Sequence, residues 1–132
     1  MNDGGDQCFK NEEKVSLAEE MKTKVKTSRY SNVIIGRDER SLLGWKLEIY
    51  LFIVEGLLID TGPYSLRKSS SRFILENHIQ QAALTHLHED HSGMAAWLQK
   101  DLQVPVYLHE QAVSFAGKRA KYGLYRHLIW GK

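Results

Sequence analysis

The stretch Thr85-His86-Leu87-His88-Glu89-Asp90-His91-Ser92-Gly93 places three imidazoles and two carboxylates within six residues. The apolar residues before it predict a strand over Ile79 to Thr85. Side chains two apart on a strand share a face, so a strand continuing to His86 and His88 would send both rings to the same side. A turn at Glu89-Asp90 would then bring Asp90 and His91 toward that point.

Ser92-Gly93 predicts the start of a helix that runs from Gly93 to Leu102, with Asp90 or Ser92 as its cap. Imidazole and carboxylate ligands together suit zinc, iron or manganese better than calcium or magnesium. A histidine-rich stretch can also be a solvated surface tract. The spacing H-x-H-x-D-H favours the metal, and we predict that it is bound by His86, His88, Asp90 and His91.

The stretch Thr85–Gly93 resembles the signature of the metallo-β-lactamase-fold hydrolases. Two further landmarks follow the same order. Leu57–Pro63 is similar to that superfamily's strand ending in Asp-Thr-Gly, and Val104–Glu110 is similar to its short strand after the helix. The resemblance covers roughly residues 25 to 115. It implies an α/β chain that supplies the N-terminal half of an αββα sandwich, as one mixed sheet with flanking helices.

The resemblance also implies roles for the site residues. His86 and His88 would hold one ion, and Asp90 and His91 a second, with zinc expected and manganese or iron as alternatives. Asp90 would be the catalytic residue, as both ligand and proton acceptor. Asp60 would orient a metal-bound histidine from behind, although a turn-forming or capping role fits its sequence equally well.

Members of this family complete each site with later His and Asp ligands, and nothing after residue 109 matches those motifs. We do not expect His109 or His127 to bind metal, and we expect His78 at a helix end. The chain would therefore be the N-terminal part of a longer product cut by truncation or a frameshift, a half that pairs with a second chain, or a degenerate, inactive remnant. A homo-oligomer or a missing C-terminal half is the expected partner.

The function that the resemblance implies is metal-dependent hydrolysis of an ester, thioester, lactone or similar bond, as in glyoxalase II or lactonases. Two alternatives remain. One is an inactive half-domain that acts only by binding a partner, and the other is an RNA-processing metallo-nuclease. A sheet without its partner would expose Trp45, Leu47, Ile49 and Leu51.

Composition limits the classes of binding partner that we expect for this chain. The chain has 132 residues and a net charge of +2, which suits one domain and gives no reason to expect nucleic acid. The single Cys8 cannot form an internal disulfide. No apolar segment is long enough for a signal or a membrane span, because the longest run is Ile49 to Val54. We expect a cytoplasmic protein with a small-molecule substrate and no membrane partner.

Patterning predicts the remaining elements. Residues 1–21 form a polar tail with a short helix from Glu13 to Met21, and residues 22–132 form the partial domain. Alternation predicts an edge strand over Lys22–Thr27 and a strand over Trp45–Val54 that is covered on both faces. We also expect strands at Val33–Ile35, Leu57–Ile59 (after a turn at Glu55-Gly56) and Val104–Leu108, and helices at Ser65–Asn77 and Glu110–Arg126.

Overall fold

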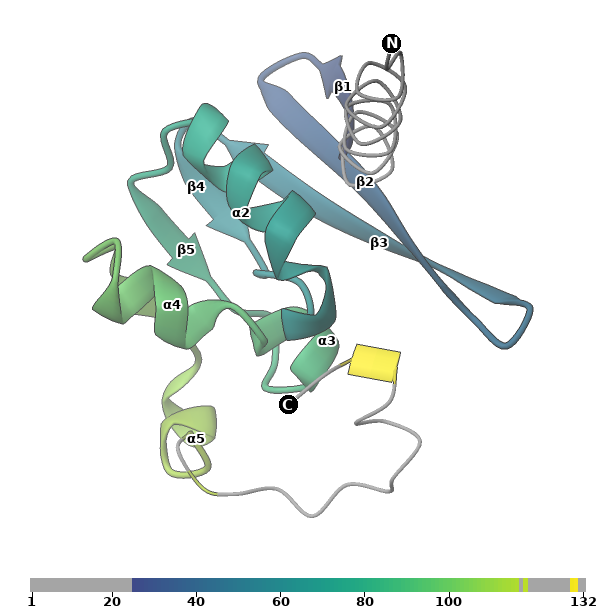
Figure 1. Ribbon diagram of the computed structural model, residues 1–132. Helices are drawn as coiled ribbons and strands as arrows, with labels where there is room; N and C mark the ends of the chain where they lie inside the picture. The colour runs from purple at the N-terminus through teal and green to yellow at the C-terminus, as the bar shows by residue number, and fades with distance from the viewer. Residues whose placement is uncertain (1–24, 117, 119–128, 131–132) are drawn as a thin grey trace, which may run out of the picture.

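The computed structural model describes residues 25–116, 118, 129 and 130 (Figure 1). The predicted tail and the first half of the predicted strand at Lys22–Thr27 lie outside these residues. One mixed sheet of six strands runs in the order β1-β2-β3-β4-β5-β6. Its strands are β1 (Lys26–Tyr30), β2 (Val33–Leu42), β3 (Trp45–Val54), β4 (Leu57–Ile59), β5 (Gln81–Ala83) and β6 (Val106–Tyr107).

Strands β1 to β4 are antiparallel neighbours, whereas β4, β5 and β6 pair in parallel. Tight turns join the antiparallel strands. Leu43 and Gly44 connect β2 to β3, and Glu55 and Gly56 connect β3 to β4, with φ values of 49° and 83° in each pair. Two successive positive φ angles are typical of two-residue hairpins. The predicted strand Trp45–Val54 and its hairpin are confirmed.

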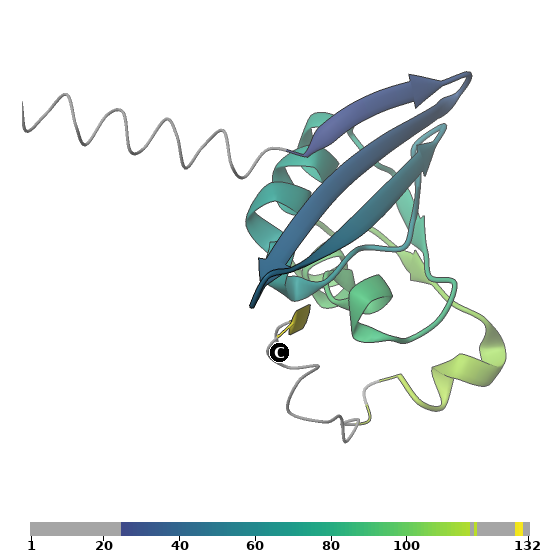
Figure 2. The same cartoon turned by 90° about the vertical axis from the view of Figure 1, so that its right-hand side faces the viewer.

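Helices cover one face of this sheet (Figures 1 and 2). A short 3-10 turn, η1 (Tyr64–Leu66), leads into α2 (Arg67–Glu76), and α4 (Ala95–Lys100) follows later in the chain. A Cβ on Gly36 would lie 2.8 Å from the Phe73 ring, so this glycine allows α2 to approach β2 closely. The core between the helices and the sheet consists of Val25, Leu51, Ile53, Leu58, Phe73, Ile74, Ala82 and Leu98.

The opposite face carries a row of directly paired residues from β2 to β6: Ile35, Phe52, Ile59, Ala83 and Tyr107. We call this row the open face. Phe52 is 38% exposed and Tyr107 is 56% exposed. The prediction that strand Trp45–Val54 is covered on both faces is therefore wrong for the described residues.

The prediction of which side chains of β3 are exposed is also wrong in part. Leu51 is only 1% exposed, because α2 and α4 pack on its side of the sheet, while Leu47 and Ile49 are partly buried. Of the predicted exposed set, only Trp45 lies fully open, at 77%, near the far end of the β2–β3 hairpin (Figure 1).

A carboxylate lies within the helix-covered layer. Asp38 on β2 is 8% exposed, accepts the backbone N–H of Glu39 at 2.8 Å and contacts Ser69 Oγ. Ser69 Oγ also lies 3.0 Å from the carbonyl of Leu66, and one hydroxyl hydrogen cannot serve both acceptors. Burial raises the pKa of Asp38, because desolvation disfavours its charged form. The hydrogen bond that Ser69 Oγ donates to this carboxylate has the opposite effect and favours the charged form.

Several elements are shorter than predicted. The helix expected at Ser65–Asn77 is present as η1 and α2, but β5 ends at Ala83 and β6 is two residues long. Tyr107 on β6 is exposed, so this strand is only partly buried. Helix α5 (Glu110–Val113) forms only the start of the helix predicted from Glu110 to Arg126, because residues 114–116 form a turn, and residues 119–126 lie outside the described residues. Within the described residues, no helix is long and apolar enough to cross a bilayer.

Candidate metal centre

The histidine-rich stretch lies on a loop and a single helical turn beyond the parallel edge of the sheet. Strand β5 stops at Ala83, and Leu84 is held to β6 by its N–H, which donates to the carbonyl of Tyr107 at 2.8 Å. The following residues are not in a strand, and α3 (Glu89–Ser92) begins after His88. The strand predicted to carry His86 and His88 therefore ends earlier.

The predicted helix start is also wrong. Ser92 ends α3 rather than beginning a helix, and Gly93 is its C-cap. His88 is the N-cap residue, with no side-chain cap from Asp90 or Ser92. The Ser92 hydroxyl instead donates back to the carbonyl of His88 at 3.0 Å. One short helical turn thus takes the place of the predicted strand-to-helix corner.

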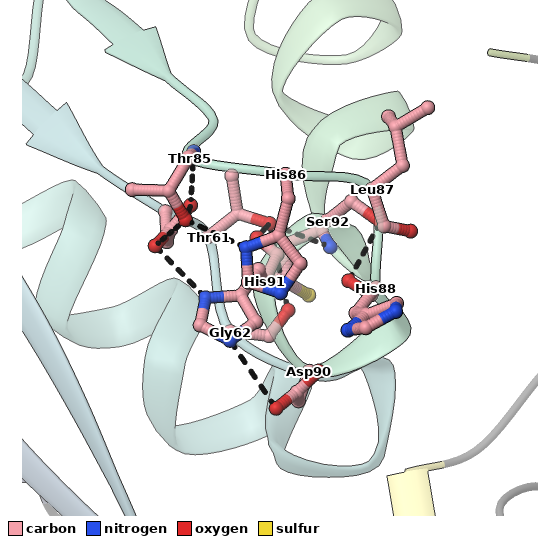
Figure 3. Close-up of polar contacts among 11 residues, drawn as sticks. Thr61, Gly62, Thr85, His86, Leu87, His88, Asp90, His91 and Ser92 are labelled. Atoms are coloured by element: carbon pink, nitrogen blue, oxygen red, sulfur yellow. Dashed lines mark hydrogen bonds and ion pairs between the residues drawn. The ribbon is translucent and has the colours of Figure 1, made fainter. Parts of the chain in front are cut away.

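Asp60 connects the loop to the end of β4. Its carboxylate accepts the backbone N–H of Thr85 at 2.8 Å, the Thr85 hydroxyl at 2.8 Å and His91 Nδ1 at 2.8 Å (Figure 3). Its own N–H donates to the carbonyl of Ala83 at 2.9 Å. Asp60 has φ of 57°, a left-handed conformation that Asp tolerates better than most side chains. Both the backbone and the carboxylate of Asp60 therefore fix the start of the loop.

These contacts determine which ring nitrogens carry protons. A carboxylate only accepts, so His91 Nδ1 must be the protonated nitrogen that donates to Asp60. The Thr85 hydroxyl gives its hydrogen to the same carboxylate. Its oxygen therefore accepts from His86 Nδ1, which lies 2.9 Å away. In the neutral ring, Nε2 of His86 is then left with a free lone pair, as a metal ligand requires, whereas Nε2 of His91 faces Asp90 Oδ2 at 3.3 Å.

The four predicted ligands lie side by side. The ring centroids of His86 and His91 are 4.0 Å apart, and those of His86 and His88 are 4.6 Å apart. The carboxylate of Asp90 lies 3.3 Å from His91 Nε2, on the side of that ring away from Asp60 (Figure 3). Neighbouring side chains on one turn thus present three imidazoles and a carboxylate at one corner.

The donor set matches the ligand preferences of zinc, iron and manganese. Among the described residues, however, no three His, Cys, Asp or Glu side chains stand ready to hold one ion together. Two ligands for each of two ions is the arrangement that the sequence predicts, and further ligands would be needed. The ligand atoms and the tautomer of His86 suit a metal ion. These four residues alone do not complete its coordination.

Thr61 is a positioning residue that the sequence did not single out. It is fully buried, and its N–H and its hydroxyl both donate to the carbonyl of His91, at 2.7 Å and 2.9 Å. The same hydroxyl accepts the N–H of Met94 at 3.0 Å. Thr61 thereby fixes the end of α3, while Asp60 fixes the ring of His91.

A close backbone contact holds α3 against the segment after β4. A Cβ on Gly93 would lie 2.5 Å from the backbone nitrogen of Tyr64 and 2.9 Å from the carbonyl oxygen of Gly62. Side-chain atoms essentially never approach backbone so closely, so this position requires glycine. Gly62 has φ of 75°, which lets the chain turn away from β4.

The other histidines lie apart from this corner. His109 caps α5, where its Nδ1 accepts the N–H of Gln111 at 3.3 Å. His78 follows the C-cap of α2 and has φ of 49°, so its placement at a helix end is confirmed. His127 lies outside the described residues.

Comparison with known proteins identifies the family. Residues 52–131 match the family model of the metallo-beta-lactamase superfamily. No curated protein matches the chain significantly in sequence.

Solved structures share the fold. A metallo-beta-lactamase from Pontibacter korlensis superposes with a TM-score of 0.61 at 23% identity, over 75% of this chain and 50% of that one. The metallo-beta-lactamase DIM-1 gives 0.54 at 18% identity, over 76% and 51%. The metallo-beta-lactamase IND-7 gives 0.54 at 15% identity, over 73% and 50%. The chain thus corresponds to about half the length of these enzymes, and it has their fold.

Proposed function

The chain belongs to the metallo-beta-lactamase superfamily, and on that premise we propose that it is a metal-dependent hydrolase whose metal site includes His86, His88, Asp90 and His91. The observation that carries the proposal is the network around Asp60. This network leaves Nε2 of His86 free and turns Nε2 of His91 toward the carboxylate of Asp90. A merely solvated histidine tract would not require such a fixed pair of tautomers.

Each residue has a role in this proposal. His86 and His88 would bind one zinc ion, and Asp90 and His91 a second, with manganese or iron as alternatives. A bound ion would lower the pKa of a water molecule toward neutrality and stabilise negative charge on a substrate oxygen. Asp90 would accept the proton of that water, because its carboxylate faces the cluster. Asp60, Thr61 and Thr85 would hold the two inner rings in place.

We propose a small-molecule ester, thioester or lactone as substrate. The net charge of +2 provides little attraction for a polyanion, which argues against an RNA-processing nuclease. We also propose a cytoplasmic location, because the single Cys8 cannot form an internal disulfide. Salt-dependent RNA binding by the full chain would instead favour the nuclease.

The test is metal binding by the full chain, followed by a substrate panel. We expect bound zinc by elemental analysis, with affinity measured by competition against a chelator. His86→Ala should weaken zinc binding at least about tenfold. His109→Ala is the matched control, because it removes an exposed histidine outside the cluster and should change nothing. The panel covers thioesters, lactones, esters and phosphodiesters with zinc, manganese or iron. A chain that binds no metal and is inert throughout would refute the proposal.

A second candidate is a non-catalytic half-domain that acts by binding a partner, and the open face favours it. The apolar row Ile35, Phe52, Ile59, Ala83 and Tyr107 is bordered by a polar group in which Glu48 contacts Arg37 and Tyr50. An apolar centre with a polar border is the usual anatomy of an interface. We propose a second copy of the chain, or a complementary C-terminal half, as the partner.

Sedimentation distinguishes the two candidates. Self-association that is lost in Phe52→Lys, in a chain that binds metal but hydrolyses nothing, would support the half-domain. Leu43→Lys is the matched control, because it places the same charge at an exposed apolar residue in the β2–β3 turn, outside the row. A monodisperse monomer that hydrolyses a substrate would reject this candidate.

A further inference from the structure

A groove lies on the helical side of the molecule, between α2 and α4, with a volume of about 490 Å³. We propose that it binds a small amphiphilic anion, meaning a carboxylate attached to a hydrocarbon or aromatic body. The proposal concerns a site separate from the metal centre and is independent of it. The groove is lined by Tyr64, Arg67, Lys68, Ser71, Leu75, Met94, Ala96, Trp97, Lys100 and Asp101.

The charge of the groove favours an anion. Three cations, Arg67, Lys68 and Lys100, line it against one carboxylate, Asp101. None of the three forms an ion pair within the part of the chain that the structure describes. The Arg67 guanidinium instead lies 4.5 Å from the centre of the Tyr64 ring, which leaves its donors available for a ligand oxygen. Unpaired cations beside an apolar surface are the complement of an amphiphilic anion.

The apolar part of the groove comes from both helices. Met94 is 1% exposed and lies at the bottom, and Trp97 packs against the core from the same side. Leu75, half-exposed, lies at the far end of α2 from Arg67. Positions 67 or 68, 71 and 75 repeat at three- and four-residue intervals, so one face of α2 supplies both the charged end and the apolar end. An elongated ligand can therefore place its carboxylate at the first turn of α2 and its body toward Leu75.

The size of the groove agrees with this class of ligand. Pockets for small molecules usually measure about 300–1,000 Å³ and combine an apolar lining with a few placed polar groups. The lining residues include none of the four predicted metal ligands. Metal binding and anion binding can therefore be tested separately on one protein.

The test uses dodecanoate, below its micellar concentration, with the full chain. Binding is measured by calorimetry and by the methyl resonance of Met94, one of three methionines in the chain. We expect dodecanoate to shift this resonance, and we expect dodecyltrimethylammonium not to do so. The variant Arg67→Gln/Lys68→Gln/Lys100→Gln should bind dodecanoate about tenfold more weakly. Leu75→Glu, an exposed change that adds like charge to the groove, should weaken it as well.

The matched control is Lys26→Gln/Arg29→Gln/Lys46→Gln, which removes three exposed cations from β1 and β3. It should bind dodecanoate with unchanged affinity and retain the wild-type circular dichroism. Equal binding of both surfactants, equal loss in both triple variants or an unmoved Met94 resonance would overturn the proposal. Binding to vesicles of anionic phospholipid without binding to free dodecanoate would also overturn it, since it would indicate a membrane surface. Zinc affinity should be the same in all variants.

Discussion

Replacing Asp60 with Asn tests how the ring of His91 is oriented. Asn fits the same space and tolerates the left-handed φ of 57° at this position, so the backbone should be preserved. The change substitutes an amide NH₂ for one carboxylate oxygen. If the remaining oxygen keeps the N–H of Thr85 at 2.8 Å, the NH₂ group faces two former donors, Thr85 Oγ1 and His91 Nδ1.

Two donors cannot bond to each other, so His91 has to change tautomer. We expect the proton to move from Nδ1 to Nε2, where it occupies the lone pair that would bind metal. Loss of charge-assisted hydrogen bonds costs about 1.5–3 kcal/mol each, and the new amide contact restores part of this. The expected loss of stability is about 2 kcal/mol. The expected loss of zinc affinity is about 10- to 100-fold, the usual effect of removing a group that orients a ligand.

The assay is long-range ¹H–¹⁵N correlation of the imidazole nitrogens in metal-free protein, with zinc titration and urea unfolding beside it. Asp101→Asn is the matched control, because it makes the same chemical change at an exposed carboxylate away from the cluster. If Asp60→Asn keeps the His91 tautomer and binds zinc within twofold of wild type, the reasoning about this network is refuted. If the tautomer changes and zinc affinity does not, the network stands but His91 is not a ligand.

Three further changes have expected outcomes. Asp38→Asn should raise the free energy of unfolding by about 1 kcal/mol at pH 7 and leave it unchanged near pH 3, measured by urea titration. Because the pKa of Asp38 is higher in the folded than in the unfolded protein, wild-type stability falls as the pH rises from the unfolded-state pKa, about 3.9, through the folded-state pKa. The Asn variant has no such group and lacks this fall. A pH-independent difference would contradict it. Gly93→Ala should lower stability by about 3 kcal/mol in thermal unfolding, since its Cβ meets backbone at 2.5 Å; a neutral result would refute the close contact. Thr61→Val should cost about 1–3 kcal/mol and Thr61→Ser much less, because the serine hydroxyl keeps both bonds; a Thr61→Ser loss as large as that of Thr61→Val would contradict the dominant role of the hydroxyl.

The central sheet was predictable because its signals are local. Alternation over Trp45–Val54 and a two-residue turn at Glu55-Gly56 specify a hairpin without reference to the rest of the chain. Which face of β3 is buried is not a local property. Apolar residues occupy both faces, and α2 decides between them by packing Phe73 against Gly36 on the side of Leu51. That choice joins positions more than twenty residues apart and leaves Phe52 on the open face.

The clustering of the four proposed metal ligands could be predicted from their spacing, because all four belong to one loop and one helical turn. The predicted strand through His86 and His88 was wrong, because the chain leaves the strand direction after Leu84, where the N–H of Thr85 donates to Asp60. Thr61 and Thr85 were not recognised as positioning residues for a related reason. A threonine hydroxyl has no distinctive pattern in sequence, and its partners lie 25 to 33 residues away. Only the fold brings them together.

One topological feature explains why those distant partners meet at this corner. Strands β4 and β5 are parallel, and Ile59 pairs with Ala83, so their carboxyl ends leave the sheet at the same edge. The residues that follow each strand, Asp60 on one side and Leu84-Thr85 on the other, must then lie next to each other. Ligand sites commonly form beyond the carboxyl ends of parallel strands for this reason. The carboxylate that orients His91 is therefore placed by strand pairing, before any metal binds, and its contacts should persist in the metal-free protein.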